Sequence, residues 1–283
     1  MLSQINSHER DRRIKFIADG HLYKVDDGTE IYTSVTTFIK SFFTPFNADG
    51  ILQQMMRSGS FKGKYGDKTV EDVKNEWKQT GSMAAEFGTL LHESIELFYN
   101  LEQTTRPDLD PKINIEYQFF LNFHKEHVIP NQMEAFRTEW YIFSEDNRIA
   151  GSIDMVYKLP NGKLCIYDWK RSKKIEYAGR KRAKQPIAHL DDCNFYHYSL
   201  QLNLYKFILQ QHYQYEIERL CLIFLHPNNS NYVIVEVPDL QLEIQAMLFH
   251  HSSFLSNSNT SVSSTTSPPQ KKISKLKLLH NPV

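Results

Sequence analysis

The sequence predicts an α/β protein with a mixed central sheet flanked by helices, and three observations support this fold class. Residues 81–100 repeat apolar side chains every three or four positions, which is typical of a helix with one buried face. Residues 136–170 alternate with a period of two in three successive segments, which predicts three consecutive strands. Helical spacing returns at 194–213, and two further apolar strands follow at 219–227 and 231–238. The predicted order is therefore α-β-β-β-α-β-β.

Length and composition are those of a globular protein. The chain has 283 residues, of which 41% are hydrophobic and 23% charged, which fits one large or two modest domains. No apolar run approaches the length of a bilayer span, and residues 1–16 are too charged for a signal peptide. We therefore expect an intracellular protein, cytoplasmic or nuclear, without a membrane partner; a mitochondrial or viral origin stays open.

Cysteine usage and net charge narrow the chemistry further. Cys165, Cys193 and Cys221 form no Cys-x-x-Cys pair, so neither a disulfide framework nor a four-thiolate metal site is expected. The formal net charge is zero, so binding to a polyanion would require local clustering of basic residues.

The N-terminal part predicts short strands followed by helices. Residues 14–34 contain the turn signals Asp19-Gly20 and Asp27-Gly28 between apolar segments. A helix is expected from about 34 to 43, and residues 47–129 are mostly helical by their spacing. We expect three parts: an N-terminal strand and helical elaboration at 1–80, a core at 81–250 that ends in a helix at 239–249, and a disordered Ser/Thr-rich tail with a basic end at 251–283.

The hairpin at 151–170 carries one aspartate on each strand. If its loop has three residues, Leu159 pairs with Lys163, and the same register sets Asp154 directly opposite Asp168. A two-residue loop would shift the register by one and separate the two carboxylates. The position of the aspartates therefore depends on the turn.

Two carboxylates that face each other need a cation. Like charges on neighbouring strands are destabilising, which favours a divalent ion between Asp154 and Asp168. Lys170 points to the same face as Asp168 because side chains alternate along a strand. The pattern acid-x-Lys occurs three more times in the chain, but only here does it end an apolar strand, where unpaired charges are costly.

Two helices carry further polar pairs at a spacing of four residues. His92 and Glu96 share a face of the first helix, and Gln201 and Tyr205 share a face of the later one. Each pair by itself is equally typical of a surface pair or of satisfied polar groups in a core.

Taken together, these residues resemble the PD-(D/E)XK nucleases of the RecB-like exonuclease branch. The resemblance covers about residues 85–226 and rests on four motifs that occur in family order: Gly-Thr-x-x-His ending at His92, Gly-x-x-Asp ending at Asp154, Asp-x-Lys at 168–170, and Gln-x-x-x-Tyr at 201–205. The segment at 21–43 is also similar, more loosely, to the one that precedes the core in mitochondrial genome-maintenance exonucleases and in phage or large-virus relatives. The family implies a restriction-endonuclease-like αβββαβ core. The four cysteines of its iron–sulfur members are missing, so no iron–sulfur cluster is expected.

The resemblance also implies roles for individual residues. One or two Mg²⁺ or Mn²⁺ ions would be held by Asp154, Asp168, His92 and the backbone carbonyl of Trp169. Lys170 would orient the attacking water or stabilise developing charge, and Gln201 and Tyr205 would hold the scissile phosphate or position Lys170. Glu96 and Glu139 are accessory acids, and Glu139 is about equally well explained as a strand-edge charge.

A basic segment follows the hairpin directly. Residues 170–184 contain eight Lys and Arg and one acid, so their local charge is about +7 by count. Such a run is often only a solvated loop, but its place beside Lys170 favours contact with a phosphate backbone, with Tyr177 offered for base stacking. The predicted DNA contacts are Arg171, Lys173, Lys174, Tyr177, Arg180, Lys181, Arg182 and Lys184.

The sequence thus predicts a metal-dependent DNA exonuclease that leaves a 5′-phosphate and a 3′-hydroxyl. It would act on single strands or duplex ends in DNA repair, recombination or replication. The alternatives are a catalytically inactive nucleic-acid-binding module of the same fold, a structural or assembly factor, and a flap or structure-specific endonuclease. The complete set of His92, Asp154, Asp168 and Lys170 favours an enzyme. Cleavage polarity, the choice between DNA and RNA, protein partners and oligomeric state stay open.

Overall fold

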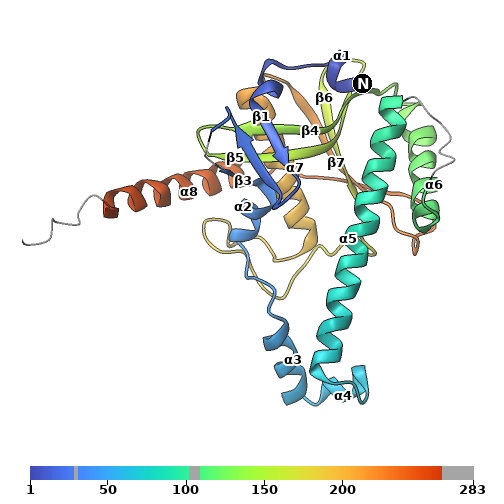
Figure 1. Cartoon of the computed structure of the whole chain (residues 1–283), viewed down its shortest axis with the longest axis vertical. Coiled ribbons are helices and arrows are strands. Elements are labelled where there is room, and N and C mark those ends of the chain that lie inside the picture. Colours follow the sequence, from blue (N-terminus) through green and yellow to red (C-terminus); the bar gives the residue numbers. More distant parts are fainter. Residues whose placement is uncertain (29–30, 102–108, 263–283) are drawn as a thin grey trace, which may run out of the picture.

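The protein is an α/β structure with a mixed eight-stranded sheet flanked by helices, as predicted (Figure 1). The computed structural model describes residues 1–28, 31–101 and 109–262. The strands are β1 (Ile14–Ile17), β2 (Leu22–Val25), β3 (Ile31–Ser34), β4 (Glu134–Ser144), β5 (Ile149–Lys158), β6 (Leu164–Lys170), β7 (Ile217–Phe224) and β8 (Val233–Glu236).

The helices include the two that the periodicity predicts most strongly. The α-helices are α1 (Leu2–Ile5), α2 (Val35–Ser41), α3 (Ala48–Arg57), α4 (Ser60–Tyr65), α5 (Val70–Leu101), α6 (Asn114–Phe123), α7 (Asn194–His212) and α8 (Gln241–Val262). Short 3₁₀ turns at Glu9–Arg13 and Pro111–Ile113 and a π turn at His124–Val128 complete them.

Strand β5 lies at the centre of the sheet and has three strand neighbours. It pairs antiparallel with β4 along one edge. The other edge is shared, because β3 pairs in parallel with Ile149 and Ala150 while β6 pairs antiparallel from Met155 onward. Residues 151–154 therefore lie in a notch between β3 and β6. The predicted site residue Asp154 is at the end of this notch.

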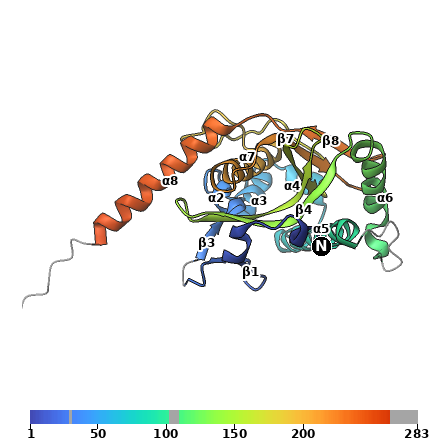
Figure 2. The ribbon, with the colours of Figure 1, turned by 90° about the horizontal axis from the view of Figure 1, so that it is seen from above.

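Each face of the sheet has its own core. Helices α2, α7 and α8 cover one face, with buried side chains such as Phe38, Leu204 and Ile244. Helices α5 and α6 cover the other face with Leu91 and Phe120. Figure 2 shows α7 and α5 on opposite sides of strands β4 and β5. Any site in the notch is thus reached by side chains from both layers.

Helix α5 is longer than the sequence pattern indicates. It begins after Thr69, which exchanges two hydrogen bonds with Asp72, at 2.8 and 3.1 Å, and so caps the first turn. The domain boundary expected at residue 80 lies inside this continuous helix, and β1–β3 of the N-terminal segment join the central sheet. These N-terminal strands are therefore part of the same sheet as the core. Figure 1 shows the first half of α5 reaching beyond the sheet toward α3 and α4.

The C-terminal helix also exceeds the prediction. The disordered tail was expected from residue 251, but α8 continues through Val262. No Gly or Pro interrupts residues 241–262, so nothing in the backbone chemistry stops the helix there. The remainder of the predicted tail, 263–283, lies outside the described residues. Within the part of the chain that the structure describes, no helix has the length and apolarity to cross a bilayer.

Candidate active site

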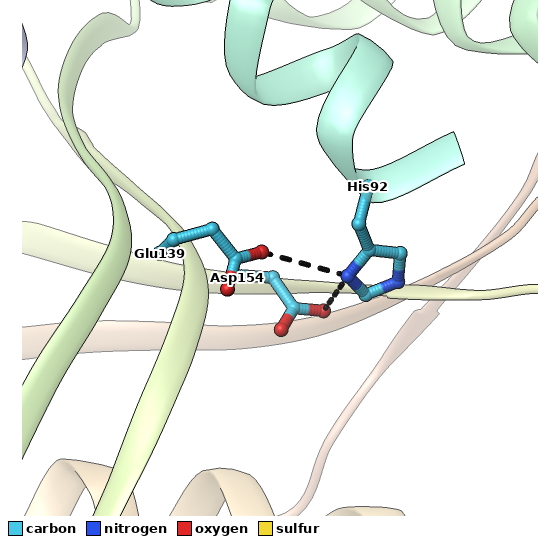
Figure 3. A group of neighbouring side chains, drawn as sticks. All are labelled: His92, Glu139 and Asp154. Carbon is cyan, nitrogen blue, oxygen red and sulfur yellow. Dashed lines mark ion pairs between the residues drawn. The ribbon is translucent and has the colours of Figure 1, made fainter. Parts of the chain in front are cut away.

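Helix α5 positions His92 beside strand β5, at the notch between β3 and β6. Leu91 and Ile95 are fully buried and anchor this part of the helix, which turns His92 toward the strands. The Nε2–H of His92 donates a hydrogen bond of 3.1 Å to the carbonyl oxygen of Trp169. Its Nδ1 atom is then left to face two carboxylates, Glu139 and Asp154, with 3.6 Å to the nearest oxygen of each (Figure 3).

These three side chains form a compact group of possible metal ligands. One ligand atom each from His92, Glu139 and Asp154 lies within 4.8 Å of the other two. Carboxylate oxygens suit Mg²⁺ and Mn²⁺, and an imidazole nitrogen is compatible with Mn²⁺ in particular. The donor set thus fits a hard divalent ion. The Trp169 carbonyl, which the resemblance implies as a further ligand, accepts the hydrogen bond from His92 Nε2.

Glu139 has an unusual backbone for its position in β4. The register pairs Thr138 with Met155 and Trp140 with Ile153, which sets Glu139 opposite Asp154. The φ angle of Glu139 is 42°, in the left-handed region that a β-strand residue normally avoids. The Ser152 hydroxyl donates a 2.9 Å hydrogen bond to its Oε2. This strained and tethered residue was predicted only as an accessory acid, yet it belongs to the compact group.

The turn between β5 and β6 has the three-residue form that the sequence analysis considered first. The Leu159 amide donates to the Lys163 carbonyl at 2.8 Å, and Gly162 adopts a φ of 84°. The β5–β6 pairing ends at Met155 with Tyr167, one step before the two aspartates. At that step the Trp169 amide donates to Asp154 Oδ2 at 3.0 Å. The predicted register is therefore confirmed from the turn as far as Met155 and Tyr167.

Asp168 belongs to a second group, on the α7 side. It is 1% exposed and forms an ion pair with Lys170 Nζ through Oδ2. Its Oδ1 accepts a 3.3 Å hydrogen bond from the Gln201 amide, which also donates to the Tyr205 hydroxyl at 3.1 Å. The Lys170 ammonium lies 4.8 Å from the centre of the Tyr198 ring. Asp168 is thus not a member of the compact group of His92, Glu139 and Asp154, although the sequence predicts it opposite Asp154 on the neighbouring strand.

The two groups have their charges balanced locally. Burial lowers the pKa of His92, but the carboxylates of Asp154 and Glu139 outweigh this effect and raise it to about 9. Burial, reinforced by Asp154 and opposed by Lys170, raises the pKa of Asp168 to about 6. Each aspartate therefore has its own positively charged neighbour. The repulsion between the carboxylates is only partly offset, because the pKa values of both Asp154 and Asp168 remain raised.

Gly151 explains the first position of the Gly-x-x-Asp motif. A Cβ atom at this residue would lie 2.7 Å from Tyr205 Cε1 and 3.0 Å from a methyl group of Val35. The ring of Tyr205 thus packs directly on the backbone of β5 in the notch. Only glycine lets α7 come close enough for Gln201 to reach Asp168.

Glu96 lies one helical turn beyond His92 and lines a cavity beside the compact group. Burial, together with Glu139, raises the pKa of the Glu96 carboxyl. It contributes no atom to the group of three, so its predicted accessory role stays a prediction.

Three of the predicted DNA-contact side chains have a fixed partner within the protein, although two of them, Arg182 and Lys184, are also exposed. Arg171 differs from the expectation, because its Nε donates to the buried Glu116 at 2.8 Å and its guanidinium lies 4.9 Å from the Phe87 ring centre. It holds α6 to the sheet and is not offered to a ligand. Arg182 binds Asp191 at 3.0 Å, and Lys184 donates to the Ser41 carbonyl at 2.8 Å.

The other members of the segment are exposed. Tyr177 is 55% exposed with its ring 4.8 Å from that of Phe195, and Lys174 lies 3.6 Å from Glu176. Lys173, Arg180 and Lys181 are exposed and make no ion pair with any described residue. These three are the side chains most available to a polyanion.

Comparisons with known proteins do not extend this picture. No protein-family model matches the chain, and no curated protein matches it. One similar solved structure is the crystal structure of SSO0001, at 16% identity over 84% of each chain with a TM-score of 0.34. A likeness at that level carries no argument about fold family or function.

Proposed function

We propose that the protein is a metal-dependent DNA exonuclease, and that its core is a restriction-endonuclease-like fold of the PD-(D/E)XK, RecB-like type. One observation carries the proposal: a compact His92, Glu139 and Asp154 group lies beside a buried Asp168–Lys170 ion pair, on adjoining strands of one sheet. The first group suits a divalent cation, and the second supplies a fixed ammonium. Phosphodiester hydrolysis needs both kinds of group.

The element order supports the finer fold proposal. Helix α5, the three antiparallel strands β4, β5 and β6, helix α7 and the parallel strand β7 occur in the order of the αβββαβ pattern, with helix α6 inserted between α5 and β4. His92, Asp154, Asp168 and Gln201 sit on the elements that the resemblance implies.

In the proposed reaction, each group has a distinct task. A Mg²⁺ or Mn²⁺ ion held by His92, Glu139 and Asp154 would polarise a phosphoryl oxygen and lower the pKa of a bound water. Asp168 fixes the Lys170 ammonium through their ion pair, and the centre of the Tyr198 ring lies 4.8 Å from the ammonium nitrogen. Lys170 then orients the attacking water or stabilises charge on the phosphate.

The α7 side chains hold this arrangement in place. Gln201 donates to Asp168 and so fixes the carboxylate that fixes the lysine. Tyr205 accepts from Gln201 and packs on Gly151, which ties the helix to the strand that carries Asp154. Hydrolysis would leave a 5′-phosphate and a 3′-hydroxyl. The exposed Lys173, Arg180 and Lys181 would retain the DNA backbone.

A cleavage assay tests the proposal. End-labelled single-stranded and duplex DNA, blocked at the 5′ or 3′ end, is incubated with the protein in Mg²⁺ or in EDTA. We expect shortening from an unblocked end in Mg²⁺ only, and loss of that activity in Asp168→Asn. The matched control is Asp239→Asn, an exposed aspartate paired with Lys206 on the surface. Cleavage by Asp168→Asn at the wild-type rate, or none by the wild-type protein, would overturn the proposal.

A further inference from the structure

A cavity of 660 Å³ opens directly beside the compact group of ligands. It lies between helix α5 and strands β1 and β4, and His92 and Glu139 form part of its wall. The basic segment at 171–184 contributes no residue to the cavity wall and reaches the end of α2, where Lys184 donates to the Ser41 carbonyl. The proposed reaction centre thus borders this cavity, and the basic segment begins next to its lysine. The volume is typical of a small-molecule site.

One wall of the cavity is aromatic. Phe16 of β1 lines it together with Tyr141 of β4, with 5.5 Å between ring centres, and His21 lies 4.9 Å from Phe16 on the β1–β2 turn. Phe16 and Tyr141 are half-buried, so part of each ring faces the hollow. Flat rings of this kind bind nucleobases by stacking, and they do so with little dependence on base identity.

The opposite wall is acidic. Glu93 and Glu96 project from α5, and neither forms an ion pair within the described residues. The lining guanidinium, Arg137, is already bound to Asp11 at 2.7 Å, and the Met1 ammonium at the rim donates to Gln4. Carboxylates accept hydrogen bonds from base amino groups and from sugar hydroxyls. They repel phosphate, so a continuing DNA backbone would be disfavoured here.

We infer that this cavity holds the terminal nucleoside of the DNA strand, at an end that carries a hydroxyl and not a phosphate. The inference rests on the proposed function and specifies its substrate. The base stacks on Phe16, the terminal hydroxyl faces Glu93 and Glu96, and the first phosphate lies at the His92 group. The remaining backbone leaves over the basic segment. A strand without an end cannot satisfy this arrangement, which is a physical reason for exonuclease action.

Gly88 provides a way to block the cavity without disturbing the core. A Cβ atom at Gly88 would meet no heavy atom within 4 Å, and the residue lines the cavity one turn before His92. Side chains on a helix lean toward its N-terminus, so a leucine here would project into the cavity and away from His92. Gly81 is the matched control, because it lies on the same helix in equally open space but does not line the cavity.

The test measures fluorescence of 2-aminopurine in a single-stranded oligonucleotide, because stacking quenches this base. Oligonucleotides carry the probe at the 5′ end, the 3′ end or an internal position, with each end as hydroxyl or phosphate. Ca²⁺ replaces Mg²⁺ so that the DNA is held without cleavage, and its integrity is checked afterwards. We expect quenching at one hydroxyl end, weaker quenching with a terminal phosphate, and none at the internal position.

The variants decide whether the cavity is responsible. Gly88→Leu and Phe16→Ala should each weaken the binding that produces terminal quenching by roughly fivefold or more, the effect of losing one stacked base. Gly81→Leu should behave as wild type, and Gly88→Leu keeps the test valid if Phe16→Ala folds poorly. Terminal quenching that is unchanged in Gly88→Leu, or absent in the wild type, would overturn the inference.

Failure of the inference differs from failure of the proposed function. If the cavity assignment is wrong, the wild-type protein still shortens DNA in Mg²⁺ while terminal quenching is absent or insensitive to Gly88→Leu. If the proposed function is wrong, no Mg²⁺-dependent shortening occurs, whatever the fluorescence shows. Equal cleavage of a circular strand and a linear strand by the wild-type protein would also overturn the inference.

Discussion

Two charged regions follow one another along the chain and differ in how their charges are held. In the first, around β5 and β6, Asp168 is buried against Lys170, and Asp154 faces His92. In the second, the segment at 171–184, most basic side chains are exposed, and several have no fixed partner among the described residues. One region is a set of matched, buried pairs, and the other is an open cationic surface.

This contrast indicates where a single substitution should have a large effect on activity and where its effect should be small. A buried charge that loses its partner pays a large desolvation cost, and a reaction centre that loses a fixed charge loses rate. An exposed charge is screened by salt and shares its task with its neighbours. Substitutions in the buried region should therefore change chemistry by orders of magnitude. Those in the exposed segment should change affinity by small factors that depend on salt.

The largest effect is expected at Lys170. Lys170→Ala removes the ammonium from the proposed reaction centre and should lower the rate of DNA cleavage roughly 100- to 1,000-fold. It also leaves Asp168 buried without its cation, so the melting temperature should fall. Adding Asp168→Asn to Lys170→Ala should recover part of the stability and none of the activity. Lys163→Ala, at the exposed start of the same hairpin strand, is the control, and wild-type cleavage by Lys170→Ala would contradict the assignment.

The next effect concerns the response to metal. An ion that binds only the folded state stabilises it by about 2.7 kcal/mol at a concentration 100 times its Kd. Mn²⁺ should therefore raise the melting temperature of the wild-type protein, and Asp154→Asn should lose most of that increase. Differential scanning calorimetry measures both, with Asp27→Asn, an exposed aspartate on the surface, for comparison. A full metal response in Asp154→Asn would show that Asp154 is not a ligand.

A smaller effect is expected from the residue that tethers Glu139. Ser152 donates a 2.9 Å hydrogen bond to Glu139 Oε2, and loss of such a support typically weakens metal affinity 10- to 100-fold. Ser152→Ala should fall near the lower figure, because the strained backbone still presents Glu139. Ser58→Ala, at the C-terminal cap of α3, should leave Mn²⁺ affinity unchanged. Equal Mn²⁺ affinities in the two variants would show that Ser152 does not support Glu139 as a ligand.

The smallest effect is expected in the exposed segment. Lys181→Ala should weaken DNA binding by a small factor and reduce the slope of log affinity against log salt by about one. Lys158→Ala, an exposed lysine at the opposite end of the β5–β6 hairpin, is the control. Fluorescence anisotropy at several salt concentrations gives both slopes. Identical slopes for the two variants would return the segment to the role of a solvated loop.

Much of the fold could be predicted because it rests on local patterns. The strands of the β5–β6 hairpin and helix α7 follow from periodicity, and the hairpin register as far as Met155 and Tyr167 follows from the three-residue turn. Arg171 could not be placed correctly, since its partner Glu116 is 55 residues away and the ion pair forms only in the folded chain. A charge run in a sequence does not reveal which of its members are bound internally.

Glu139 is the instructive omission at the site. Its position opposite Asp154 follows from the four-residue connection at 145–148 between β4 and β5, which pairs Ser144 with Ile149. The turn argument used for the β5–β6 hairpin, applied to the β4–β5 hairpin, predicts this position of Glu139. Its left-handed backbone, in contrast, has no sequence signal. The pairing of His92 with Asp154 likewise depends on how helix α5 packs on the sheet, and no local sequence pattern predicts that packing.

A calorimetric titration with Mn²⁺ tests the central claim most directly, because it asks whether the His92, Glu139 and Asp154 group holds a divalent ion. Glu139→Gln keeps the shape of the side chain and removes its charge, and Glu134→Gln makes the same change at an exposed position on the same strand. We predict that the wild type and Glu134→Gln bind Mn²⁺ alike and that Glu139→Gln binds it at least tenfold more weakly. Equal binding by all three proteins would contradict the account.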